Sequence, residues 1–322
     1  MNARTFLIFA IAAAAGAVHP LVTMARPAEV DAAATAGQRK VVKLRTLSPG
    51  DTLYVLLGGG GNSLALIGDD GVVLIDTKSP GWGQAISDAV EAVTERPVRT
   101  IINTHAHLDH TGGNAEFPGA TAIVAHENTK MAMEKMAEFR GANARFLPNQ
   151  TIHDKMSLLD GRDRIDVYYF GAGHTNGDLV VVFPAKRVAY FGDLFPSKAA
   201  PFIDTANGGS GVRFPETLGK AVAQITGVTR VITGHEEGLS AERSKSAVSV
   251  DITTPRTMTW SDLQEYADFN RDFLGAVQDA IKAGKTMEQA AATLTLPERY
   301  HGDDMHEAAA NVAAIYHELG AK

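Results

Sequence analysis

Apolar and polar residues along the chain form two kinds of pattern. Short runs rich in β-branched residues are typical of buried strands. They predict strands at residues 41–45, 52–57, 62–67, 72–76, 98–103, 120–125, 164–170, 179–183, 188–191 and 228–233. Longer stretches, several with apolar residues every three or four positions, predict helices at residues 84–94, 126–140, 215–225, 261–283, 286–294 and 304–319.

The order of these elements divides the chain. Strands and helices are mixed as far as residue 250, and from Thr259 onward only helices are predicted. We therefore expect one α/β domain over residues 37–250 and a C-terminal helical extension over residues 251–322 that packs on the same core. An apolar helix face is more often packing than a separate interaction module.

The first 36 residues have a different composition. Arg4 gives a basic start, residues 6–18 form an apolar, alanine-rich stretch, and small residues follow at Ala25 and Ala36. This order is typical of a signal peptide. We expect cleavage near one of these two alanines and a periplasmic or secreted mature protein; the alternative is a buried N-terminal helix. No later stretch is apolar and long enough to span a bilayer.

Composition and charge exclude several classes of protein. The chain has 322 residues, a net charge of −7 and no cysteine. The charge argues against a nucleic-acid surface, which needs a clustered basic face. Without cysteine there is no disulfide, and no metal ligand can be a thiolate. We expect a small-molecule substrate, while the sequence does not indicate an oligomeric state.

The strand predicted at residues 98–103 runs into the most informative segment of the chain. Residues 104–113 read Thr-His-Ala-His-Leu-Asp-His-Thr-Gly-Gly and contain His105, His107, Asp109 and His110. Three protonated imidazoles this close would repel one another, whereas neutral imidazoles can each offer a lone pair to a divalent cation. The segment therefore predicts a metal site.

Three further candidate ligands follow predicted strands and have glycine close by. They are His174 in Gly-Ala-Gly-His, Asp193 in Tyr-Phe-Gly-Asp and His235 in Val-Ile-Thr-Gly-His. Small neighbours at a strand end allow a metal to approach. A set of histidines and aspartates suits zinc and also tolerates iron or manganese.

With these motifs, residues 45–240 resemble the metallo-β-lactamase-fold superfamily. The resemblance implies a four-layer αβ/βα sandwich of two mixed β-sheets with a dinuclear metal site along one edge. It implies that His105, His107 and His174 hold one metal, that Asp109, His110 and His235 hold the second, and that Asp193 bridges them. Asp76 would orient a ligand.

Two metals that share one water would lower its pKa from about 15.7 towards 7 and so supply hydroxide. The resemblance therefore implies an exported hydrolase that contains two zinc ions and cleaves a carbonyl-centred bond in a β-lactam, lactone or thioester, with Asp109 orienting the nucleophile. Asp193 replaces the cysteine of one group of true β-lactamases. His107 stands where flavodiiron oxygen reductases have glutamate.

Two alternatives remain open. The first is a mononuclear iron dioxygenase acting on sulfur compounds, a branch of the same superfamily that would use His105, His107 and His174. The second is a non-catalytic binding protein with a structural metal. Structural zinc sites are usually closed by four protein ligands, so seven candidate ligands favour a catalytic site.

Substrate contacts are less clearly indicated than metal ligands. Asn114, Tyr190, Lys198 and Arg213 lie in or near loops that could line the site, and Lys198 could bind a substrate carboxylate. The four glycines at residues 58–61 lack the lysine and hydroxyl residues of a phosphate-binding loop, so we predict a flexible turn there.

Overall fold

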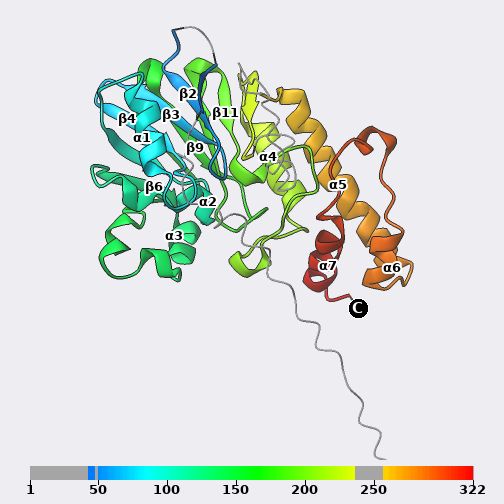
Figure 1. The fold of residues 1–322 in the computed structure, drawn as a ribbon. Coiled ribbons are helices and arrows are strands. Elements are labelled where there is room, and N and C mark those ends of the chain that lie inside the picture. The colour runs from blue at the N-terminus through cyan, green and yellow to red at the C-terminus, as the bar shows by residue number, and fades with distance from the viewer. Residues whose placement is uncertain (1–42, 48–49, 236–256, 322) are drawn as a thin grey trace, which may run out of the picture. The chain divides into compact units, whose positions relative to one another are not determined.

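The computed structural model describes residues 43–47, 50–235 and 257–321, and these form two mixed β-sheets with helices on their outer faces (Figure 1). The predicted signal peptide and the domain boundary predicted at residue 250 lie outside the described residues. The predicted α/β sandwich is confirmed. None of the helices in the described part of the chain is both long and apolar enough to cross a membrane.

The first sheet has seven strands in chain order. They are β1 (Lys43–Thr46), β2 (Leu53–Leu57), β3 (Ser63–Gly68), β4 (Gly71–Ile75), β5 (Val98–Ile102), β6 (Ala122–His126) and β7 (Gln150–Ile152). Strands β1 to β4 pair antiparallel, and β4 to β7 pair parallel. Parallel pairing places the carboxyl ends of β4 and β5 side by side.

The second sheet has five strands in the order β12-β11-β10-β9-β8. Their bounds are β8 (Lys155–Leu158), β9 (Ile165–Tyr169), β10 (Leu179–Phe183), β11 (Val188–Tyr190) and β12 (Arg230–Ile232). Only β11 and β12 pair parallel, so their carboxyl ends are also neighbours.

The helices are α1 (Gly83–Glu91), α2 (Leu108–Thr111), α3 (Glu127–Met133), α4 (Phe214–Gln224), α5 (Trp260–Lys282), α6 (Met287–Ala292) and α7 (Ala308–Glu318). Side chains of both sheets, such as Leu64 and Val181, form one buried cluster between them. Ile86 of α1 packs on the outer face of the first sheet. Leu218 of α4, Phe269 of α5 and residues of α7 cover the second sheet. Burial of these apolar faces stabilises the layers.

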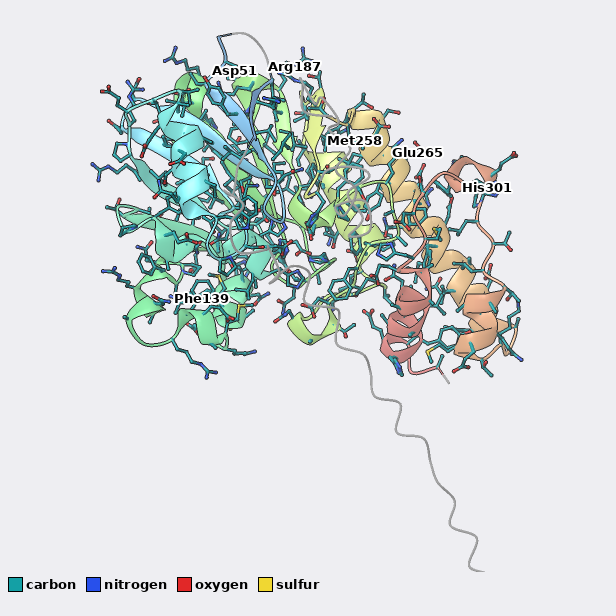
Figure 2. All side chains as sticks on the ribbon, in the orientation of Figure 1. Asp51, Phe139, Arg187, Met258, Glu265 and His301 are labelled. Atoms are coloured by element: carbon teal, nitrogen blue, oxygen red, sulfur yellow. The ribbon has the colours of Figure 1, made fainter. Side chains whose placement is uncertain are left out.

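Some elements differ from the predictions. The helix predicted over residues 126–140 ends at Met133, because the chain becomes extended at Met136. Phe139, which Figure 2 labels, packs in a small cluster with Ala106 and Ala132. Strands β7 and β8 were not predicted. They lie at sheet edges and most of their side chains are exposed or half-buried, so they carry little apolar signal.

Candidate metal centre

The candidate ligands meet at one end of the two sheets. Asp76 follows β4, and the segment that begins at His105 follows β5, its parallel neighbour. In the second sheet, Asp193 follows β11 and His235 follows β12, again a parallel pair. His174 comes from the loop after β9. Strand pairing therefore brings together residues that are far apart in the sequence.

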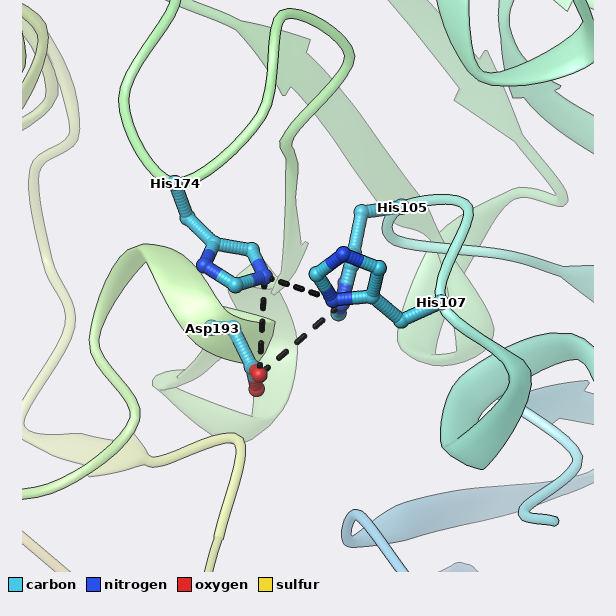
Figure 3. Close-up of side chains that lie close together, drawn as sticks. All are labelled: His105, His107, His174 and Asp193. Carbon is cyan, nitrogen blue, oxygen red and sulfur yellow. Dashed lines mark hydrogen bonds and ion pairs between the residues drawn. The ribbon is translucent and has the colours of Figure 1, made fainter. Parts of the chain in front are cut away.

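The first ligand group consists of His105, His107 and His174, with Asp193 beside them (Figure 3). Nε2 of His174 lies 2.9 Å from Nδ1 of His107. Oδ2 of Asp193 lies 3.7 Å from Nε2 of His174 and 3.8 Å from Nε2 of His105. One potential ligand atom from each residue falls within 4.8 Å of the others, so the group could hold a metal ion.

The second ligand group consists of Asp109, His110 and His235. Oδ1 of Asp193 lies 3.3 Å from Nε2 of His110, and Oδ2 of Asp193 lies 3.2 Å from Nε2 of His235. Oδ2 of Asp109 lies 3.5 Å from the same His235 nitrogen. Asp193 therefore faces both groups, which is the position of a bridging carboxylate.

In the first group, a partner outside the group binds the outer nitrogen of each imidazole. Nε2 of His107 lies 2.7 Å from Oδ2 of Asp204, and Nδ1 of His174 lies 2.7 Å from the carbonyl oxygen of Phe202. Nδ1 of His105 lies 3.1 Å from Oγ1 of Thr104. Donation of a proton to these acceptors leaves the inner nitrogen with a free lone pair, as a metal ligand requires.

Asp76 orients His110 of the second group. Its Oδ2 lies 2.7 Å from Nδ1 of His110 and also accepts hydrogen bonds from the hydroxyls of Thr104 and Tyr190. Asp76 is fully buried and has a φ of 58°. A left-handed aspartate costs free energy, and here it places the carboxylate behind the imidazole. Nε2 of His110 consequently faces the centre.

Unsatisfied polar atoms test whether these residues fit a metal. Nε2 of His105, Nε2 of His110 and Oδ1 of Asp193 are buried and have no hydrogen-bond partner among the described residues. Buried polar atoms without partners are costly. Nε2 of His105 lies 3.8 Å and Nε2 of His110 lies 3.3 Å from the Asp193 carboxylate, and a divalent cation in each group would satisfy these atoms. The donor set therefore fits metal ions.

Electrostatics separates two histidines of the first group from the other three. Burial lowers the pKa of His105 well below its usual value and that of His174 to about 4. Burial also opposes protonation of His110 and His235, but the carboxylates around them, Asp193 foremost, together outweigh it and raise the pKa of both. For His107, the hydrogen bond that it donates to Asp204 and the nearby carboxylates together raise the pKa against the effect of burial. A metal would displace protons from these raised groups on binding.

Glycines let the backbone approach the second group. A Cβ on Gly61 would lie 2.3 Å from the His110 ring, and one on Gly60 would lie 2.8 Å from Cβ of Asp109. Gly60 also has a φ of 104°, which other residues rarely adopt. The segment predicted as a flexible turn is therefore a close-packed wall of the centre.

The structure shows that three residues expected to contact substrate are bound by other groups of the protein. Asn114 is fully buried and hydrogen-bonded to Asn103 and Thr77, so it fixes the loop instead of facing substrate. Tyr190 is fully buried and donates its hydroxyl to backbone and to Asp76.

Nζ of Lys198 lies 2.7 Å from Asp262 and 3.3 Å from Glu265, which Figure 2 labels on α5. The lysine is thus held by carboxylates of the protein. Arg213 is exposed at the N-terminus of α4.

Sequence reasoning missed Asp204 and the carbonyl of Phe202. Asp204 accepts a hydrogen bond from the backbone N–H of Asn207 and so caps a short 3-10 turn. Capping is the only role that the neighbouring sequence indicates for this aspartate. A capping aspartate gives no indication of a contact with His107, 97 positions earlier. Only the fold places this segment behind the first group.

A family model described as the metallo-beta-lactamase superfamily matches residues 56–237. Among curated proteins, the chain is 33% identical over 146 residues to the 2,4-dinitroanisole O-demethylase subunit alpha of Nocardioides sp. (strain JS1661), a match that covers 44% of this chain and 43% of the relative. It is 27% identical over 180 residues to metallo-beta-lactamase IND-1 of Chryseobacterium indologenes, and this match covers 55% of this chain and 72% of the relative. The chain thus matches less than half of the demethylase subunit.

Solved structures show the same fold. A metallo-beta-lactamase from Pontibacter korlensis has a TM-score of 0.57 at 18% identity, and the match covers 72% of this chain and 99% of that one. A double mutant of the sec-alkyl sulfatase PisA1 has a TM-score of 0.68 at 15% identity, and the match covers 86% of this chain and 50% of that one.

Proposed function

The chain belongs to the metallo-β-lactamase superfamily, and from this premise we propose that it is a zinc-dependent hydrolase that cleaves a carbonyl-centred bond. The observation that carries the proposal is the placement of Asp193 between two groups of ligands, together with three buried ligand atoms that have no hydrogen-bond partner among the described residues. This arrangement suits two neighbouring cations. The residues that would hold them are His105, His107 and His174 on one side and Asp109, His110 and His235 on the other, with Asp193 between.

When bound, two divalent cations lower the pKa of a shared water and stabilise negative charge on the oxygen of the substrate carbonyl. The chain positions the reacting groups around them. Asp109 is the candidate catalytic residue because its side chain is 34% exposed and faces both His110 and His235. From this position it can orient the attacking water and hold its proton. Gly60 and Gly61 let the backbone pack directly against Asp109 and His110.

The substrate classes we propose are β-lactams, lactones and thioesters. The printed name of the IND-1 relative supports the first of these. The demethylase and the sulfatase neighbour are named for other bonds, and so an aryl ether and a sulfate ester belong in the same test panel. We also propose that residues 1–36 direct export, which amino-terminal sequencing of the mature protein would test.

The test is metal analysis of the purified chain together with hydrolysis of this panel before and after chelation. We expect about two zinc ions per chain and turnover that stops on chelation and returns with zinc. A double variant with His105→Ala and His107→Ala should lose both the bound zinc and the turnover. The control is His153→Ala, which removes an exposed histidine remote from the ligand groups.

Turnover that persists in the double variant or in metal-free protein would contradict the proposal. One iron per chain with oxygen consumption on a persulfide substrate would favour the dioxygenase instead. Bound zinc with no turnover of any panel member would contradict the proposed substrate classes.

A further inference from the structure

Phe202 differs from every other phenylalanine in the described part of the chain. Its exposed fraction is 38%, whereas the ten others that the structure describes are all buried, with exposed fractions of 7% or less. An exposed aromatic ring is costly in water, and such rings commonly line ligand sites. The exposure of the Phe202 ring therefore calls for a structural or functional explanation.

The ring lies against the first ligand group. Its centroid is 6.1 Å from that of His107 and 5.8 Å from that of His174. The backbone around it is fixed, because the Phe202 carbonyl binds His174 and Asp204 binds His107. Ile203 is buried in the cluster under the second sheet. The phenyl group is thus held at the edge of the centre and is not on a free loop.

The accessible polar groups of the centre lie elsewhere. Asp109 and His235 have side chains that are 34% and 38% exposed, and both belong to the second group. The first group is more enclosed, with His105 and His174 at 3% or less and His107 at 21%. A molecule reaching the centre therefore meets carboxylate and imidazole on one side and a phenyl ring on the other.

We propose that Phe202 binds a planar aromatic group of the substrate on the side of the first ligand group. This assignment rests on the proposed function, since it places the bond to be cleaved beside Asp109 and Asp193. Offset or edge-to-face contact between rings would favour aromatic over small aliphatic groups by about tenfold in affinity. Phe202 is thus a specificity residue, and it contacts no reacting atom.

The experiment measures binding without turnover. The full chain is loaded with Co²⁺, and phenylmethanethiol and ethanethiol are titrated separately while the thiolate-to-cobalt absorption is followed. Both probes bind the metal through a thiolate sulfur, so the change in the ratio of their dissociation constants between wild type and a variant isolates the contribution of Phe202. The variants are Phe202→Ala and Phe202→Leu, and the control is Val93→Ala, which shortens another exposed apolar side chain. Cobalt content is measured for each.

We expect wild type and Val93→Ala to bind the aromatic thiol about tenfold more tightly than ethanethiol. Phe202→Ala should bring the two affinities within about twofold of each other without changing that for ethanethiol, and Phe202→Leu should fall between. An unchanged ratio in Phe202→Ala would overturn the proposal. Equal weakening of both thiols would also overturn it, because the ring would then shield the imidazoles. A ratio that depends on Phe202 in a protein that hydrolyses nothing in the panel would contradict the proposed function alone.

Discussion

The two ligand groups share Asp193 but differ in nearly every other respect. In the first group, His105 and His174 are buried, and their pKa values are low because of that burial. In the second, Asp109 and His235 are partly exposed, and Asp193 raises the pKa of His110 and His235. His105 and His174 therefore offer neutral imidazoles, whereas His107 of the first group and both histidines of the second must lose a proton before they bind a metal.

The two groups also differ in the hydrogen-bond partners that orient their ligands. The segment that contains Phe202 and Asp204 binds two imidazoles of the first group, and Thr104 binds the third. In the second group, the described part of the chain provides such a partner for His110 alone, Asp76. Orientation of ligands before binding reduces its entropic cost. We expect the first group to bind metal more tightly and the second to face the substrate.

Removal of one ligand from each group gives the largest expected effects. His105→Ala should bind no metal tightly and lose about a thousandfold in kcat/KM, since several kcal/mol of charge stabilisation depend on the metals. His235→Ala should keep one tightly bound ion and lose about a hundredfold. Metal content after dialysis and steady-state rates check both variants. Equal metal loss in the two would remove the distinction between the groups.

Asp204→Ala tests the support of the first group. Loss of its hydrogen bond to His107 should weaken the tighter metal site by about 10- to 100-fold, a typical effect for such partners. Asp204→Asn, which keeps the shape and one acceptor oxygen, should have a smaller effect. Competition with a chromophoric chelator measures the affinity. A change in metal affinity confined to the weaker site would contradict the prediction, because it would mean that Asp204 supports the second group.

A buried carboxyl in the loop that carries His174 predicts a pH dependence of stability. Thr175 donates hydrogen bonds to Asp178, but burial outweighs them and raises the pKa of Asp178 to about 7. Folded protein therefore binds more protons than unfolded protein between about pH 4 and 7. The stabilisation of the protonated form is complete below this window and is lost as the pH rises through it.

Asp178→Asn does not titrate and serves as the reference. From pH 5 to 8, the free energy of unfolding of metal-free wild type should fall by about 2 kcal/mol relative to this variant. Urea unfolding of both proteins at each pH measures the difference. A constant difference across the range would mean that Asp178 is ionised throughout.

The smallest expected effect concerns Lys198. Because Asp262 and Glu265 already hold its ammonium group, Lys198→Ala should leave KM within about twofold of wild type. The ion pairs are partly exposed, so the cost in unfolding free energy should stay below about 1 kcal/mol. Steady-state kinetics and thermal unfolding measure the two quantities. A tenfold rise in KM would restore Lys198 as a substrate contact.

Apolar periodicity predicted the strands, the motifs that follow them predicted the candidate ligands, and these ligand motifs carried the resemblance that implied the layered fold. His105, His174 and His235 each lie in a loop that follows a strand. The contacts that support the ligands leave no local signal in the sequence. Asp204 reads as a capping residue and Asn114 as a loop residue, and their partners are fixed only when the sheets pack together.

Exposure could not be read from the sequence either. Phe202 and the ten buried phenylalanines are chemically identical, and the fold alone places one of them beside the imidazoles. The elements missed, β7 and β8, are short edge strands whose side chains largely face water and so show no apolar pattern.

Calorimetric titration of zinc into the metal-free full chain tests the central claim most directly, since it counts the ions and compares the two groups in one experiment. We predict two binding steps, one ion each, with the first at least about tenfold tighter than the second. Saturation at one ion per chain, or two steps of equal affinity, would contradict the account of two unequal ligand groups that share Asp193.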